Sequence, residues 1–153
     1  MTVCFELRTL IGASVDAVFD LSLSIDAHVG SMAESGERAV AGVTHGLIGL
    51  GEEVTWKARH FGLPFTMTSR ITELERPLRF VDEQVRGPFR RFHHEHVFTA
   101  DGERTVMVDR INFDAPLGPL GRIAERAVLS TYLPKLIQER NSYLKRIAEP
   151  RNA

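Results

Sequence analysis

The chain has 153 residues, of which 43% are hydrophobic and 25% charged, and its formal net charge is -1 at pH 7. A chain of this length fits a single domain, residues 1–153, which can bury a core without disulfides or structural metals. The small net charge gives no electrostatic basis for a nucleic-acid partner, and no apolar run is long enough for membrane insertion.

The amino-terminal part predicts one strand followed by two short helices. Residues Val3 to Ile11 are rich in strand formers. The next two segments, Ser14 to Leu23 and Ser24 to His28, each begin with a serine that can cap a helix. The only cysteine, Cys4, lies in the predicted strand, where we expect a small buried side chain. A single cysteine excludes an internal disulfide and, together with an amino terminus unlike a signal peptide, predicts a cytoplasmic protein.

The middle of the chain predicts strands separated by tight turns. Four are expected here: Arg38–Val43, Glu53–His60, Phe65–Leu74 and Leu78–Arg86. Alternation in the second of them places Trp56 and His60 on one face, and alternation in the third places Met67 on one face. The inward face of Leu78–Arg86 stays undecided, because the length of the preceding loop sets which residues point inward.

Residues Phe89–Thr99 and Glu103–Asp114 predict a hairpin, because Asp101-Gly102 is a strong two-residue turn signal. With that turn, the two residue numbers of each cross-strand pair add up to 203. The register then pairs Phe92 with Ile111, His94 with Asp109, His96 with Met107 and Phe98 with Thr105. All of these side chains are expected on one face of the sheet.

The last part of the chain predicts a long amphipathic helix over Gly118 to Ala148, with an apolar stripe at helical spacing. We expect the polar run Glu139-Arg140-Asn141 on the solvated surface of this helix. The order of one strand, two helices, six strands and a final helix predicts an α+β domain whose curved antiparallel sheet grips the last helix.

Three segments carry a resemblance to a known superfamily: Glu52 to Gly62, Gly87 to His96, and Ala115 to Gly121. Together with the order of elements, they resemble the START-like, helix-grip (SRPBCC) superfamily, and within it the bacterial polyketide cyclase/dehydrase branch of unassigned function. The resemblance implies a seven-stranded sheet wrapped around the carboxy-terminal helix. It also implies an apolar cavity for lipids, sterols, polyketides or similar molecules. Members include carriers, cyclases and regulators, so the resemblance implies no catalytic set.

The inward faces of the predicted strands define a candidate ligand-binding set. Its members are Trp56, His60, Met67, Phe92, His94, His96, Met107, Asp109 and Ile111. Within this set, His94 and Asp109 are the candidate catalytic pair, since a carboxylate can fix the tautomer of an imidazole and raise its basicity. We expect the pKa of His94 to be raised by Asp109. The alternative is a core histidine and aspartate that only satisfy each other.

The pattern His94-x-His96, with His60 as a third imidazole, has the composition of a zinc site. The aromatic residues expected around these histidines suit an apolar ligand better than an ion. We therefore expect no metal and no cofactor.

These observations lead to two functional hypotheses. The first is a carrier or sensor that binds a hydrophobic small molecule (a lipid, a polyketide or an aromatic-like compound) in the cavity, as a monomer or a homodimer. The second is a cyclase or dehydratase in which His94, assisted by Asp109, serves as acid/base in the same cavity.

Overall fold

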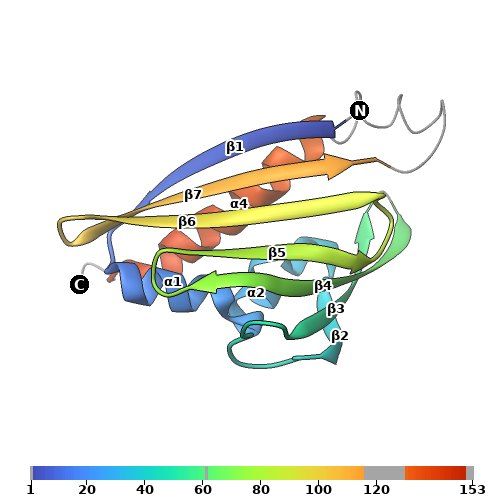
Figure 1. Ribbon diagram of the computed structural model, residues 1–153, viewed down its shortest axis with the longest axis horizontal. Coiled ribbons are helices and arrows are strands. Elements are labelled where there is room, and N and C mark those ends of the chain that lie inside the picture. Colours follow the sequence, from blue (N-terminus) through green and yellow to red (C-terminus); the bar gives the residue numbers. More distant parts are fainter. Residues whose placement is uncertain (1, 61, 116–129, 151–153) are drawn as a thin grey trace.

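Seven strands form one antiparallel sheet in the computed structural model, which describes residues 2–60, 62–115 and 130–150 (Figure 1). The strands are β1 (Thr2–Ile11), β2 (Arg38–Gly42), β3 (Glu53–His60), β4 (Leu63–Glu75), β5 (Arg79–Arg86), β6 (Arg91–Asp101) and β7 (Arg104–Asp114). Their order across the sheet is β1-β7-β6-β5-β4-β3-β2, so that β2 to β7 form a meander and β1 pairs with β7.

The helices lie together on one face of the curved sheet (Figure 1). They are α1 (Val15–Leu23), α2 (Ile25–Ser31), the short 3-10 helix η1 (Ala33–Ser35) and α4 (Ser130–Ala148). As expected, Ser14 and Ser24 cap α1 and α2: their Oγ atoms accept hydrogen bonds from the backbone N–H of Ala17, at 3.4 Å, and of Ala27, at 3.1 Å. The predicted α+β class and order of elements are confirmed.

Helix α4 packs along the sheet through an apolar stripe at helical spacing. Leu133, Ile137 and Leu144 are buried on it. Leu144 joins the larger core cluster with residues of α1, whereas Leu133 and Ile137 join a second cluster with Phe92 of β6. The predicted start of this helix, residues 118–129, lies outside the described residues.

The predicted register of the β6–β7 hairpin is wrong by two residues. Asp101 pairs with Arg104, so Gly102 and Glu103 are the two loop residues and paired numbers sum to 205. Glycine at the first loop position matches the backbone, because Gly102 has φ +63°, in the left-handed region. A shift of two residues keeps every side chain on its predicted face, because side chains alternate with a period of two.

The surface departs from prediction at Cys4, which is exposed. It lies in the edge strand β1, where Val3, Phe5 and Leu7 pack on the core and the alternate positions point away.

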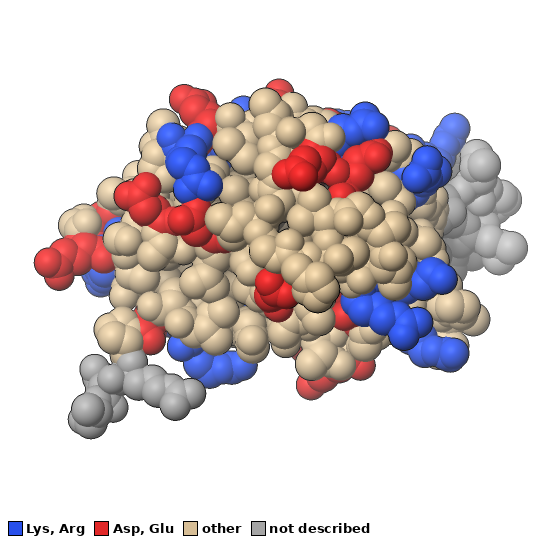
Figure 2. Space-filling view, turned by 90° about the horizontal axis from the view of Figure 1, so that it is seen from below, with Lys and Arg blue, Asp and Glu red and all other residues tan. Residues whose placement is uncertain are grey.

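On the face seen in Figure 2, basic and acidic side chains are interspersed around a region of other residues, and no large patch of one sign is visible there. Among the described residues, no helix combines the length and the hydropathy that a membrane span requires.

Candidate functional site

A cavity of about 260 Å³ lies between the sheet and the helices, with residues of α1, α2, β3 to β6 and α4 in its wall. Six of the nine residues in the predicted binding set line it: Trp56, His60, Met67, Phe92, His94 and His96. The other three do not line it; Met107, Asp109 and Ile111 are at most 1% exposed and belong to the packed interior of β7. The structure therefore divides the predicted set into a cavity wall and a layer behind it.

Four titratable side chains form a compact cluster at this wall, on β5, β6 and β7. Asp82 is the cross-strand partner of His94, and Asp109 is the cross-strand partner of His96. The shortest contacts are diagonal: His94 Nε2 lies 2.7 Å from Asp109 Oδ1, and His96 Nε2 lies 2.7 Å from Asp82 Oδ2. The predicted direct pairing of His94 with Asp109 is wrong because of the register shift, yet diagonal side chains on one face remain within reach.

Each imidazole in this cluster approaches both carboxylates. His94 Nδ1 is 4.0 Å from Asp82 Oδ2, and His96 Nδ1 is 3.3 Å from Asp109 Oδ1. The two rings stack, with centroids 3.7 Å apart. Hence one nitrogen of each ring lies toward the fully buried Asp109, and the other lies toward Asp82, which lines the cavity.

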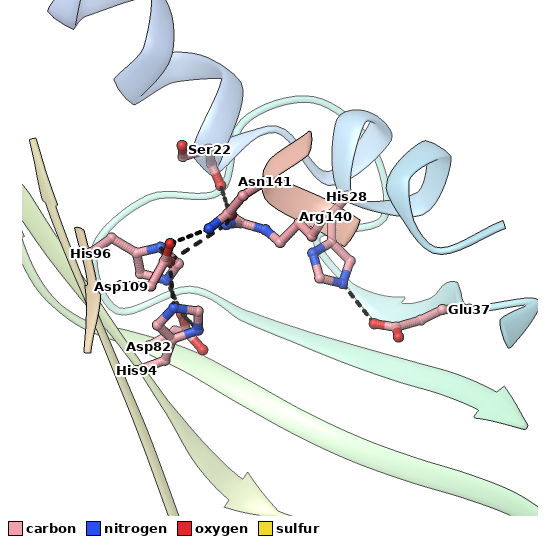
Figure 3. A network of polar contacts seen from close by, with 9 residues as sticks. All are labelled: Ser22, His28, Glu37, Asp82, His94, His96, Asp109, Arg140 and Asn141. Atoms are coloured by element: carbon pink, nitrogen blue, oxygen red, sulfur yellow. Dashed lines mark hydrogen bonds and ion pairs between the residues drawn. The ribbon is translucent and has the colours of Figure 1, made fainter. Parts of the chain in front are cut away.

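Helix α4 completes the cluster from the opposite layer with Arg140 and Asn141 (Figure 3). Asn141 Nδ2 donates a 2.6 Å hydrogen bond to Asp109 Oδ2, and Arg140 Nη1 lies 3.7 Å from Asp109 Oδ1. The guanidinium also donates to Asn141 Oδ1 at 3.0 Å and to the backbone carbonyl of Ser22 at 3.5 Å. The expectation that Arg140 and Asn141 lie on a solvated surface is wrong, because they are 3% and 1% exposed.

The electrostatics of the cluster distinguish the two histidines. Burial and the neighbouring His96 lower the pKa of His94, and the bond to Asp109 does not compensate. Burial also opposes the charged form of His96, but its contacts with Asp109 and Asp82 outweigh burial and raise its pKa. The expected rise in the pKa of His94 is thus wrong, and the rise falls on His96 instead.

Both carboxylates remain ionised in this setting. Burial favours the neutral acid, yet the hydrogen bond from His94 and the nearby charge of His96 hold the pKa of Asp109 well below its usual range. The pKa of Asp82 is lowered as well, because its hydrogen bond with His96 and the charge of His94 outweigh burial. The cluster therefore combines two anions with Arg140 and with one imidazole that is easier to protonate than the other.

A second polar group lies elsewhere on the cavity wall. His28 Nε2 is 2.7 Å from Glu37 Oε1 (Figure 3). The centroid of the His28 ring lies 4.3 Å from that of the Trp56 ring. His60 does not approach the His94 cluster; its Nδ1 lies 2.6 Å from the Tyr132 hydroxyl instead. Burial lowers the pKa of His60. The structure therefore does not bring together the three imidazoles that the sequence suggested as a zinc set.

Sequence reasoning missed Asp82, Arg140 and Asn141 as members of the cluster. No local signal in the sequence decided which face of β5 points inward, so the sequence could not identify Asp82 as a member of the cluster. The helix carried a signal, since positions 140 and 141 continue the buried spacing of Leu133, Ile137 and Leu144. Polar residues on an apolar stripe are therefore candidates for a buried network.

Comparison with known proteins supports the architecture. A family model described as polyketide cyclase / dehydrase and lipid transport matches residues 2–149. A search of curated proteins finds no match.

Solved structures with a similar fold have low sequence identity. The Zhui aromatase/cyclase from Streptomyces sp. R1128 superimposes with a TM-score of 0.78 at 16% identity, over 97% of this chain and 94% of the other. TTHA0849 from Thermus thermophilus gives a TM-score of 0.75 at 16% identity, over 96% of this chain and 100% of the other. Ginseng major latex-like protein 151 from Panax ginseng gives a TM-score of 0.67 at 14% identity, over 97% of this chain and 99% of the other. At these identities the likeness establishes a shared fold.

Proposed function

The chain belongs to the polyketide cyclase / dehydrase and lipid transport family, and from this premise we propose that it binds a hydrophobic small molecule between its sheet and α4, as a carrier or a sensor. The observation that supports the proposal is the cavity itself. Apolar side chains dominate its wall, among them Trp56, Phe92 and Ile137. Its volume of about 260 Å³ is slightly below the range of ligand sites for drug-sized molecules, about 300–1,000 Å³, which favours a small ligand.

The polar groups of the wall give the proposed ligand an orientation. Asp82, His94 and His96 lie together at one part of an otherwise largely apolar surface. A hydroxyl or carbonyl of the ligand would bond there, because a polar group buried without a partner costs free energy. The apolar body would occupy the space beside Trp56. We therefore propose a ligand with a large apolar body and at least one hydrogen-bonding group.

Binding can be measured through Trp56, the only tryptophan of the chain. We expect energy transfer from Trp56 to an environment-sensitive lipid probe, and displacement of the probe by apolar ligands. Ala58→Phe places a ring in the cavity wall and should weaken probe binding tenfold or more. The matched control is Ala41→Phe, on the exposed part of the edge strand β2, which should bind like the parent.

The proposal predicts further that native mass spectrometry of protein from its own host shows a bound apolar compound. Equal probe binding by the Ala58→Phe and Ala41→Phe proteins would place the probe outside the cavity. Absence of energy transfer from Trp56 across a chemically broad panel of probes would contradict the proposal.

A second function, acid/base catalysis in the same cavity, is favoured by the position of His94. If its Nε2 carries the hydrogen donated to Asp109, its Nδ1 is an unprotonated acceptor on the Asp82 side. Such a nitrogen can remove a proton from a carbon next to a carbonyl, as a cyclase or dehydratase requires. Loss of turnover in His94→Gln, with probe binding intact, would support catalysis. A bound compound recovered unchanged after long incubation would favour the carrier.

A further inference from the structure

We propose that Asp82, His94 and His96 form a site for one divalent transition-metal ion at the cavity wall. One ligand atom from each side chain can be chosen so that all three lie within 4.8 Å of one another. The sequence suggested His60 as the third ligand, and the structure places Asp82 there instead. These three side chains are also the polar group proposed to bond the hydrophobic ligand, but metal binding can be measured without that ligand.

The contacts of the His94 ring match the usual environment of metal-binding histidines, and His96 Nδ1 lies near the same carboxylate, Asp109. Such a histidine donates its second ring N–H to a carboxylate or a carbonyl, which fixes the ring and raises its basicity. Here Asp109 Oδ1 forms a 2.7 Å hydrogen bond with His94 Nε2 and lies 3.3 Å from His96 Nδ1, which makes no hydrogen bond in the structure. The remaining nitrogens, His94 Nδ1 and His96 Nε2, then both approach Asp82 Oδ2, at 4.0 and 2.7 Å.

The two separations from Asp82 Oδ2 allow a shared ion. Zinc lies about 2.0–2.2 Å from imidazole nitrogen and carboxylate oxygen, so two of its ligand atoms can be at most about 4.4 Å apart. The distances of 4.0 and 2.7 Å from Asp82 Oδ2 to the two nitrogens are within this limit. An ion would replace the present hydrogen bond between His96 and Asp82. Two imidazoles and one carboxylate are the ligand set of several zinc enzymes and of non-haem iron sites.

The surrounding charges allow a cation. With both imidazoles neutral, Asp82 and Asp109 contribute two negative charges and Arg140 one positive charge, which leaves one negative charge. Arg140 lies on the Asp109 side, 3.7 Å from its Oδ1. Asp109 is also bonded to Asn141, so it would position the rings and would not bind the ion. The side chain of Asp82 is 21% exposed and lines the cavity, which leaves the ion accessible.

An ion held by three protein ligands would keep at least one coordination position for water or for an oxygen of a molecule in the cavity. There it would act as a Lewis acid that polarises a carbonyl. Among the described residues, Asp82, His94 and His96 form the only group of three metal-binding side chains. The His28–Glu37 pair has the same short contact, 2.7 Å, but provides two ligands only, and it therefore serves as an internal control.

The test uses the full chain after removal of metals by a chelator. Co²⁺ is titrated at neutral pH and followed by its visible absorption bands, and Zn²⁺ binding is measured by calorimetry. We expect one ion per chain. Asp82→Asn and His96→Gln should each weaken binding about a hundredfold or more, whereas Asp109→Asn should weaken it about 10–100-fold through lost positioning. Glu37→Gln should bind like the parent.

Circular dichroism and melting temperature establish that each variant is folded before titration. Asp82→Asn and His96→Gln change different strands, so one remains informative if the other does not fold. Absence of ion-dependent absorption and heat in the parent protein would overturn the proposal, as would unchanged affinity in either folded variant. Probe binding at Trp56 in the chelator-treated protein reports on the hydrophobic cavity separately, and its result does not depend on the ion.

Discussion

Replacing Asp109 with asparagine should destabilise the protein by about 3–5 kcal/mol at pH 7, the range for removing one partner of a buried ion pair. Asp109 is 0% exposed and bonds to His94 at 2.7 Å and to Asn141 at 2.6 Å. The substitution keeps the shape and removes the charge. Arg140 then loses a buried anion 3.7 Å away, and the Asn141 amide meets an amide in place of a carboxylate oxygen.

Urea denaturation of the chelator-treated protein, followed by circular dichroism, measures this loss. The control is Asp101→Asn, which removes a carboxylate paired with Arg104 three residues away at the exposed end of the hairpin. Its free energy of unfolding should match that of the parent within error, because exposed ion pairs contribute little. A loss below about 1 kcal/mol for Asp109→Asn would refute the view that this carboxylate holds the network together.

The pH dependence provides a second criterion for the same variant. The folded-state pKa of Asp109 is well below its unfolded value, so its stabilising contribution is complete above the unfolded pKa, near pH 4. That contribution is lost as the pH falls toward the folded-state pKa. The difference in stability between the parent and Asp109→Asn should therefore shrink below about pH 4. A difference that stays constant between pH 5 and pH 3 would contradict the ionised assignment.

Three further predictions concern the histidines, α4 and the hairpin turn. NMR titration of the ring carbons in chelator-treated protein should give His94 a pKa below 6.5 and His96 a pKa above it; the reverse order would contradict the charge assignment. Leu144→Ala should lower the free energy of unfolding in urea by about 2–5 kcal/mol, whereas Ile147→Ala, at a side chain 44% exposed, should cost far less; equal losses would refute the assigned helix face. Gly102→Ala should cost about 1 kcal/mol in the same assay, because alanine is strained at φ +63°, and a neutral result would contradict the turn geometry.

The order of elements and the faces of the central hairpin could be predicted from the sequence alone. Alternation in β6 and β7 places His94, His96 and Asp109 on one face. That assignment survives the error of two residues in the register, because side chains repeat with a period of two. Serine caps and the apolar stripe of α4 are likewise local signals, and each requires only a few neighbouring residues.

The composition of the polar cluster was decided by the tertiary structure. The inward direction of Asp82 depends on the register between β5 and β6. The sequence of the connecting loop does not specify that register. Asn141 reaches Asp109 across 32 residues of sequence, and Arg140 reaches the Ser22 carbonyl across 118. Burying a charged or polar side chain is unfavourable unless partners surround it, and these partners come from different elements. Their burial therefore follows from the packing of α4 against the sheet, which no single stretch of the chain contains.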